Sequence, residues 1–339
     1  MSERMTRRGA VALIGGTAGA AAAQQLIGEP AGRIAPANEL VNTFEMAAMA
    51  RRKLDSFTFA AIDDAGSGDR AVFDRMTFRP RLMINTTELD LTIDLFGQKS
   101  FAPILVGPAE GMQRFHPEGE SAAARGATAA KATMIISERS SLALAKIAPD
   151  APGFWYQVFA GTDVRAVRSK IDEAVKSGCK AVVLTGGGGA DWAMVDQLRK
   201  GLSVPFLLKG VMSAAEAKTA VERGMQGIVI SAYRGGPQVS GMTSSLEVLP
   251  SIVEAAGGRA PILIDGGFRR GGDVLKAIAL GARAVTVTRP VLWGLAAYGA
   301  PGVQQVLELL QTETARAMGM CGKPNIASLD KTLVRLHKR

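Results

Sequence analysis

The chain has 339 residues, of which 47% are hydrophobic and 21% charged, so a globular protein built on one barrel-sized domain fits its length. Its formal net charge is +9, but aromatic residues make up only 5% and no stripe of basic and aromatic residues occurs, which excludes nucleic-acid binding as an expected function. No apolar run is long enough to span a membrane, and the two cysteines indicate no disulfide framework. The positive charge instead favours a small anionic substrate.

The first residues differ in composition from the rest of the chain. Arg7 and Arg8 precede a mildly apolar stretch, and small residues follow at positions 20–23. This order is typical of a twin-arginine signal peptide, which directs folded proteins out of the cytoplasm. We therefore expect residues 1–24 to be a signal segment and the protein to be exported or periplasmic. The alternative is a disordered or amphipathic N-terminus on a cytoplasmic protein.

The next segment, residues 25–100, is expected to hold a linker, a helix and a cap hairpin. Apolar residues recur at helical spacing over residues 39–54. Alternation over residues 85–96 favours the hairpin.

Residues 101–339 contain eight short apolar runs that alternate with helical patterns. Such runs are typical of buried parallel strands. We expect strands at residues 102–107, 133–137, 153–159, 181–185, 205–209, 227–231, 261–265 and 284–288. This alternation predicts an α/β protein, a (β/α)8 TIM barrel with an N-terminal helical and hairpin extension and a C-terminal helix.

Polar residues end most of these strands, on the barrel rim that carries active sites. They are Ser137, Gln157, Thr185, Lys209, Ser231, Asp265 and Arg289. Lys209 ends an apolar run, so its burial requires an anionic partner, either a ligand or Asp265. Glycines and arginines over residues 265–271, together with Arg289, predict a phosphate site.

Several motifs together resemble the FMN-dependent α-hydroxy-acid dehydrogenase and oxidase family. They are Phe78-Arg-Pro-Arg81, His116-Pro-Glu-Gly-Glu120, Leu208-Lys209-Gly210, Asp265-Gly-Gly-Phe-Arg-Arg-Gly271 and Arg289-Pro290. The resemblance implies an FMN cofactor, a small anionic substrate and a homo-oligomer, commonly a tetramer. It also implies the residues that bind FMN, which are Pro108, Ala109, Ser137, Gln157, Thr185, Lys209, Asp265, Gly267, Arg269, Thr288 and Arg289.

The substrate half departs from this resemblance. Where the family has a histidine that takes the hydroxyl proton, the chain has Tyr233, and the family's arginine clamp aligns near Pro237. The tyrosine that follows strand three in the family is Phe159 here. The loop after strand four is reduced to the glycines at 186–189 and a short link, so the family's lid is expected to be deleted.

New polar residues stand near these departures, and two interpretations of them remain open. In the first, Glu110 or Tyr233 is the base, Arg139 or Arg234 grips the substrate carboxylate, and Phe159 lies beside the substrate. A neighbouring arginine is then expected to lower the pKa of Tyr233 from its ordinary value of about 10. In the second, Glu110 and Arg139 simply form a surface ion pair.

The favoured function is FMN-dependent oxidation of a small acidic CH–OH substrate by hydride transfer to flavin N5. In this hypothesis Lys209 stabilises negative charge on the ring. The alternatives are a non-catalytic barrel that binds flavin or a phosphate ligand, and an FMN enzyme of altered reaction type. No metal motif occurs, and no haem or nicotinamide motif identifies the electron acceptor, which stays unknown.

Overall fold

The computed structural model of the protein describes residues 33–64, 70–187, 191–235 and 243–337. The chain divides into two units, Met1–Pro36 and Ala37–Arg339, and the elements below all belong to the second unit. The signal segment expected at residues 1–24 lies outside the described residues.

A parallel sheet forms the centre of the second unit. Its strands are β4 (Ile104–Val106), β5 (Ile135–Ser137), β6 (Trp155–Phe159), β7 (Ala181–Thr185), β8 (Phe206–Val211), β9 (Gly227–Ile230), β10 (Ile262–Asp265) and β11 (Ala284–Val287). They pair in the order β4-β11-β10-β9-β8-β7-β6-β5. A parallel bridge between Val106 and Met134 joins β4 to β5, and Val106 N donates to Thr133 O at 2.9 Å. The predicted eight strands and the TIM barrel are confirmed.

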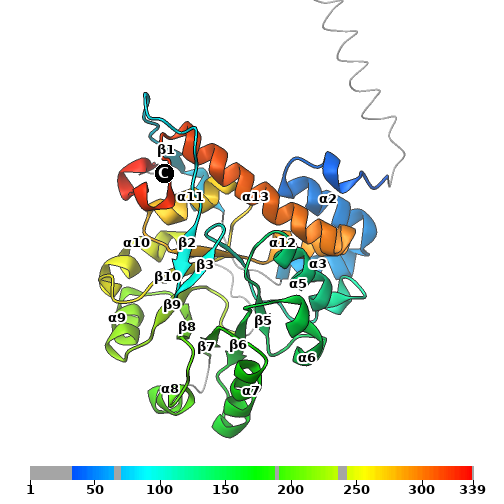
Figure 1. The fold of residues 1–339 in the computed structure, drawn as a ribbon, viewed down its shortest axis with the longest axis vertical. Coiled ribbons are helices and arrows are strands. Elements are labelled where there is room, and N and C mark those ends of the chain that lie inside the picture. The colour runs from blue at the N-terminus through cyan, green and yellow to red at the C-terminus, as the bar shows by residue number, and fades with distance from the viewer. Residues whose placement is uncertain (1–32, 65–69, 188–190, 236–242, 338–339) are drawn as a thin grey trace, which may run out of the picture. The chain divides into compact units, whose positions relative to one another are not determined.

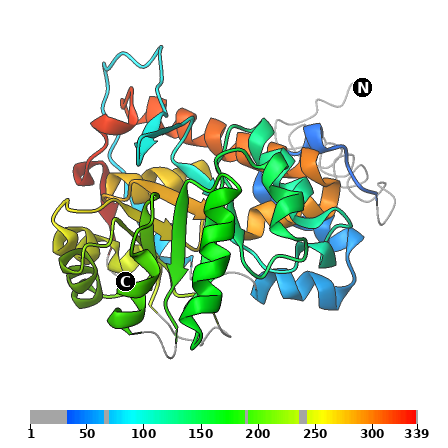
Figure 2. The ribbon, with the colours of Figure 1, turned by 60° about the horizontal axis from the view of Figure 1, so that its bottom comes forward.

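Helices surround the strands, as Figure 2 shows for α7 in green. After the strands come α5 (Gly119–Ala129), α6 (Leu144–Ile147), α7 (Val164–Lys176), α8 (Trp192–Arg199), α9 (Ala214–Glu222), α10 (Ser245–Ala256), α11 (Gly271–Ala279) and α12 (Arg289–Tyr298). Because helices cover the barrel, strand β7 is buried along its whole length. Ser213 and Glu216 form a capping box at the start of α9, since the side chain of each bonds the backbone of the other.

The N-terminal extension differs from its prediction in two places. Helix α2 (Thr43–Lys53) begins later than residue 39, because the Asn42 side chain caps it and residues Ala37–Glu39 form the separate 3-10 turn η1. The expected hairpin is present but lies further along the chain than residues 85–96, because it consists of β2 (Ile93–Leu95) and β3 (Gln98–Ser100). The connection is a two-residue turn in which Phe96 and Gly97 both have positive φ, a geometry that suits tight hairpins.

Two further helices and a C-terminal segment complete the unit. Helix α3 (Ser56–Asp64) and α4 (Ala71–Asp74) follow α2, and β1 (Met76–Phe78) pairs antiparallel with β12 (Val334–Leu336). The long helix α13 (Ala300–Met320) packs against α5, α11 and α12 (Figure 1). The remaining 3-10 turns are η2 (Met112–Arg114), η3 (Ala148–Asp150), η4 (Ile326–Ser328) and η5 (Lys331–Leu333).

Among the described residues, no helix combines the length and apolarity needed to cross a membrane. Both cysteines are buried and free. Burial raises the pKa of the Cys179 thiol to about 12, and its Sγ donates to Ala181 O at 3.0 Å. Cys179 therefore serves the packing of the barrel, as its place before a strand predicts.

Candidate active site

Lys209 is the buried cation at the carboxyl end of the barrel. Its side chain is 2% exposed, and its Nζ lies 3.1 Å from Asp265 Oδ2. Nζ also donates to Ser231 Oγ at 2.7 Å, and that hydroxyl donates to Asp265 at 3.0 Å. The ion pair that the sequence left as an alternative is thus present, and it satisfies a charge that burial would otherwise penalise. The ammonium has three donors, so one remains for a ligand.

Three predicted cofactor residues lie on the neighbouring strands. Ser137 is the last residue of β5, Thr185 is the last residue of β7 and Gln157 is the middle residue of β6. All three are buried. Gln157 Nε2 donates to Thr185 Oγ1 at 2.6 Å, and Ser137 is paired in register with Gln157. Polar side chains in this position form a ready set of donors and acceptors for the edge of a planar heterocycle.

The loop after β10, residues 266–270, is called the phosphate loop here. Gly266 and Gly267 both have positive φ, at 107° and 86°. The backbone N–H groups of Gly267 and Phe268, and that of Thr288 after β11, make no hydrogen bond with the part of the chain that the structure describes. Such N–H groups in a glycine-rich turn bind anions.

Side chains and a helix end reinforce this anion site. Arg269 is buried, with its guanidinium 4.9 Å from the centre of the Trp293 ring and its Nη1 donating to Phe268 O at 2.8 Å. Arg289 is the first residue of α12, whose start has no side-chain cap. A helix N-terminus next to two arginines favours a phosphate.

Near Lys209, the side chains of Glu110, Arg139, Phe159 and Tyr233 form what we call the Glu110 cluster. Tyr233 Oη donates to Glu110 Oε1 at 2.6 Å, and Arg139 Nη1 lies 3.1 Å from the same oxygen. The Arg139 guanidinium stacks 3.7 Å from the centre of the Phe159 ring. Lys209 Nζ lies 5.3 Å from the centre of the Tyr233 ring, so the cluster and the buried cation are neighbours. Segments after β4, β5 and β9 and the end of β6 meet here.

The electrostatics of this cluster correct one sequence expectation. Burial raises the pKa of Tyr233 to about 12, and the hydrogen bond and negative charge of Glu110 act in the same direction. Arg139 opposes them but is the smaller influence. Arg139 thus acts in the expected direction, but the net pKa of Tyr233 is raised and not lowered. Tyr233 is therefore a neutral hydrogen-bond donor to Glu110 near neutral pH.

Other predicted residues lie elsewhere on the rim. Arg234 Nη2 donates to Glu216 Oε1 at 2.9 Å at the start of α9, so its guanidinium is engaged outside the Glu110 cluster. His116 accepts from Glu118 N at 3.2 Å, as a residue that fixes the start of α5. Pro108 and the buried Ala109 follow β4 directly. The glycine loop after β7 falls partly outside the described residues.

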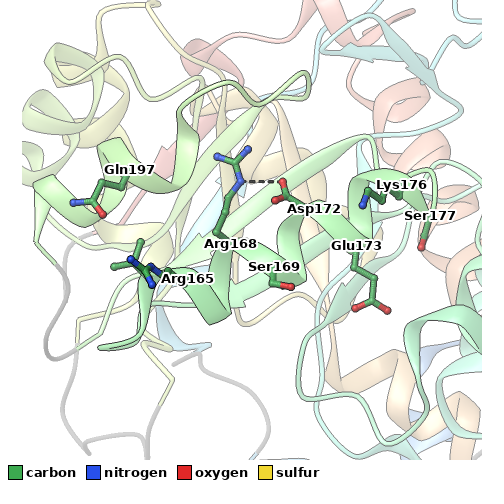
Figure 3. Close-up of a pocket in the computed structure, with 9 residues that line it drawn as sticks. Arg165, Arg168, Ser169, Asp172, Glu173, Lys176, Ser177 and Gln197 are labelled. Atoms are coloured by element: carbon green, nitrogen blue, oxygen red, sulfur yellow. Dashed lines mark hydrogen bonds and ion pairs between the residues drawn. The ribbon is translucent and has the colours of Figure 1, made fainter.

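A separate cavity of about 640 Å³ lies in the outer helical layer and not at the strand ends (Figure 3). It is bordered by α7 and by Gln197 of α8. Within it Arg168 Nε bonds Asp172 at 2.9 Å, and Arg168 Nη1 bonds Leu198 O at 3.2 Å. These bonds tie α7 to α8, so we assign Arg168 to the packing of the two helices and not to the active site.

Sequence reasoning missed the residues that hold the phosphate loop from behind. Asp273 Oδ2 accepts from Arg269 N and Arg270 N, both at 3.0 Å, and Arg70 pairs with it at 2.8 Å. Thr43 donates to Arg269 O at 2.6 Å. Asp273 stands in a recognisable motif, but nothing local to Thr43 or Arg70 indicates a partner about two hundred residues away.

The sequence matches the family of FMN-dependent dehydrogenases over residues 50–186 and 187–336. The chain belongs to this family. It is 32% identical to an L-lactate oxidase of Nostoc sp., covering 87% of this chain and 98% of the relative. It is also 32% identical to human 2-hydroxyacid oxidase 1, over 83% and 91% of the two chains. A crystal structure of mandelate oxidase superposes with a TM-score of 0.83 at 32% identity. The superposition covers 88% of this chain and 100% of the mandelate oxidase chain.

FMN is the cofactor of this family, and the residues of this dehydrogenase chain fit it. The phosphate loop, Arg269 and the start of α12 suit the phosphate. A Cβ on Gly107 would lie 2.3 Å from Thr288 Oγ1, so only glycine permits this close approach of the two strand ends. The buried Thr286 Oγ1 between them has no hydrogen-bond partner among the described residues, which is consistent with a polar group being bound there.

Proposed function

We propose that this FMN-dependent enzyme oxidises a small acidic substrate at a CH–OH group, with Tyr233 in place of the histidine that usually takes the hydroxyl proton. The observation that carries the proposal is the Glu110 cluster, which sets a carboxylate, a guanidinium and two rings beside the buried Lys209. Such an oxidation requires a general base, a cationic group that binds the acidic group of the substrate, and a fixed cation beside the flavin.

The proton acceptor is Glu110. When bound, FMN supplies N5 as the acceptor of the hydride from the substrate carbon. The hydroxyl proton of the substrate then needs a base, and Tyr233, with a pKa of about 12, is protonated and unsuited to this role. Tyr233 instead orients the Glu110 carboxylate through its 2.6 Å hydrogen bond. In this proposal Glu110 is the base and Tyr233 positions it.

Arg139 binds the acidic group of the substrate. Its Nη1 serves both Glu110 and Gly235 O, but a guanidinium has five N–H donors in all. Its stacking on Phe159 fixes the plane of the group, and its side chain is 44% exposed, so an incoming carboxylate can reach it. Lys209 holds a positive charge beside the flavin ring, on which negative charge develops during reduction.

The alternative of a non-catalytic flavin-binding barrel has less support. The relatives named above are described as oxidases, and the chain matches them across most of their length. An altered reaction type draws support only from the substitutions around Tyr233 and Phe159. The relatives act on lactate, 2-hydroxy acids and mandelate by their names, which favours a hydroxy acid as substrate here.

Anaerobic bleaching of the yellow holoenzyme tests the function. Panels of 2-hydroxy acids, amines and aldehydes are added separately, and absorbance of the bound flavin is followed. We expect at least one hydroxy acid to bleach it. Bleaching by amines or aldehydes alone would contradict the substrate class, and no bleaching by any compound would favour the non-catalytic alternative.

We also propose that the protein is exported by the twin-arginine route. The support is the Arg7-Arg8 pair, the apolar stretch after it, and the family match, which begins only at residue 50. Replacing both arginines by lysine in the full chain is expected to retain the protein in the cytoplasm. Equal export of both versions would contradict the proposal.

A further inference from the structure

We propose that α2 and the start of α4 act as a clamp that sets the phosphate loop, so that docking of this N-terminal segment and binding of FMN are thermodynamically linked. The clamp consists of Thr43, Arg70 and Phe73. These residues are positioning residues, because each acts on the backbone of the loop. The inference depends on the FMN site and not on the identity of the substrate.

Thr43 supplies the first contact. It is 1% exposed and donates from Oγ1 to Arg269 O at 2.6 Å. Thr43 is the first residue of α2, so its position is fixed by the Asn42 cap. Loss of the hydroxyl would leave a buried carbonyl without this partner, which costs more than the bond itself contributes.

Arg70 supplies the second contact. Its Nη1 bonds both Gly267 O and Asp273 Oδ2. The same Asp273 oxygen accepts from Arg269 N and Arg270 N. One guanidinium therefore holds a loop carbonyl directly and two loop N–H groups through a buried carboxylate.

Phe73 packs against the phosphate loop at Gly267. A Cβ on Gly267 would lie 2.6 Å from the Phe73 ring, and Phe73 packs edge-on against Phe268 with ring centres 5.3 Å apart. Lys276 Nζ donates to Phe73 O at 2.8 Å, which anchors α4 to α11 behind the loop. The clamp is thus in van der Waals contact with the loop as well as hydrogen-bonded to it.

The clamp determines which backbone groups face an anion. In a trans peptide the carbonyl and the following N–H point in opposite directions. Holding Gly267 O on Arg70 directs the Phe268 N–H away from Arg70, and that N–H has no partner among the described residues. An unheld loop can turn its carbonyls toward the phosphate, and FMN binding must then offset the cost of reordering it.

Titration of FMN into the apoprotein, followed by quenching of flavin fluorescence, tests the clamp. Thr43→Val keeps the shape of the side chain and removes the donor, and we expect its Kd for FMN to rise about tenfold. Thr43→Ser keeps the hydroxyl and is expected to restore the affinity. Thr58→Val is the matched control, because the Thr58 side chain bonds the local Asp55 on an exposed surface and, among the described residues, makes no contact with the phosphate loop.

Hydrogen exchange supplies a second readout, which also applies to the wild-type chain alone. In the wild-type chain, FMN is expected to slow exchange of the amides in Thr43–Lys53 severalfold, and Thr43→Val is expected to lose most of this protection. Unchanged FMN affinity in Thr43→Val, with only a lower melting temperature, would reduce Thr43 to a structural residue. If the variant does not fold, absence of FMN-dependent protection in the wild type would overturn the linkage.

Discussion

The two sides of the active site are built differently. On the flavin side, Lys209 and Arg269 are buried, and each contacts residues distant in the chain, Asp265 for Lys209 and Thr43 and Trp293 for Arg269. On the substrate side, Glu110 and Arg139 are 34% and 44% exposed and bond each other. The resemblance drawn from the sequence implies that the first side keeps the family's residues and that the second replaces them. A buried network in which each member satisfies the next tolerates few replacements, whereas a half-exposed rim can exchange its charges at small cost.

Glu110→Gln is expected to have the largest effect, because it removes the proposed base. We expect the rate of flavin reduction by substrate to fall about 10³-fold, within the usual range for a general base. The affinity for FMN is expected to stay unchanged. Stopped-flow reduction under anaerobic conditions measures this, and a rate within a few fold of the wild type would show that Glu110 belongs only to a surface ion pair.

Lys209→Met is expected to affect both sides. It removes the cation beside the ring and leaves Asp265 unpaired, so we expect flavin reduction to slow about 10²-fold and FMN binding to weaken. Lys323→Met is a matched control, because Lys323 is also buried and paired with an aspartate, Asp330, at 2.8 Å. If both variants slow reduction equally, the effect of Lys209 is one of stability and not of position.

Arg139→Met is expected to act on substrate binding. Loss of the guanidinium that binds the acidic group of the substrate predicts an increase in KM of about 10-fold to 100-fold with a smaller change in kcat. Arg234→Met is the control, since Arg234 pairs with Glu216 outside the Glu110 cluster. A larger increase in KM in Arg234→Met would show that Arg234, and not Arg139, binds the acidic group of the substrate.

The smallest expected effect is a spectroscopic one at high pH. Tyr233 in the folded chain has a pKa of about 12, above its unfolded value of 10.0, so stability from this proton is intact below pH 10 and lost as pH rises toward 12. Glu110→Gln is expected to lower this pKa, because it removes the negative charge. Tyrosinate absorbance of the apoprotein measures it, with Tyr233→Phe to assign the signal among the three tyrosines.

Local sequence patterns were enough to predict the strands of the barrel and part of the active site. The eight apolar runs are short-range signals, and the strands that they predict are confirmed. The hairpin was misplaced because the alternation at residues 85–96 competes with a turn set by Phe96 and Gly97. The direction of the Tyr233 pKa shift was misjudged because burial and the Glu110 carboxylate, which lies 123 positions away in the chain, outweigh the arginine.

By itself the sequence determined the barrel, the strands that carry Gln157, Lys209 and Asp265, and the resemblance to a family whose cofactor is FMN. Periodicity and motif spacing encode these features directly. Only the tertiary structure decided that Lys209 pairs with Asp265, that Glu110 meets Tyr233 and Arg139, and that Thr43 and Arg70 hold the phosphate loop. Each of these depends on contacts between residues far apart in the chain, and such contacts are set by how the barrel closes and how the N-terminal helices pack on it.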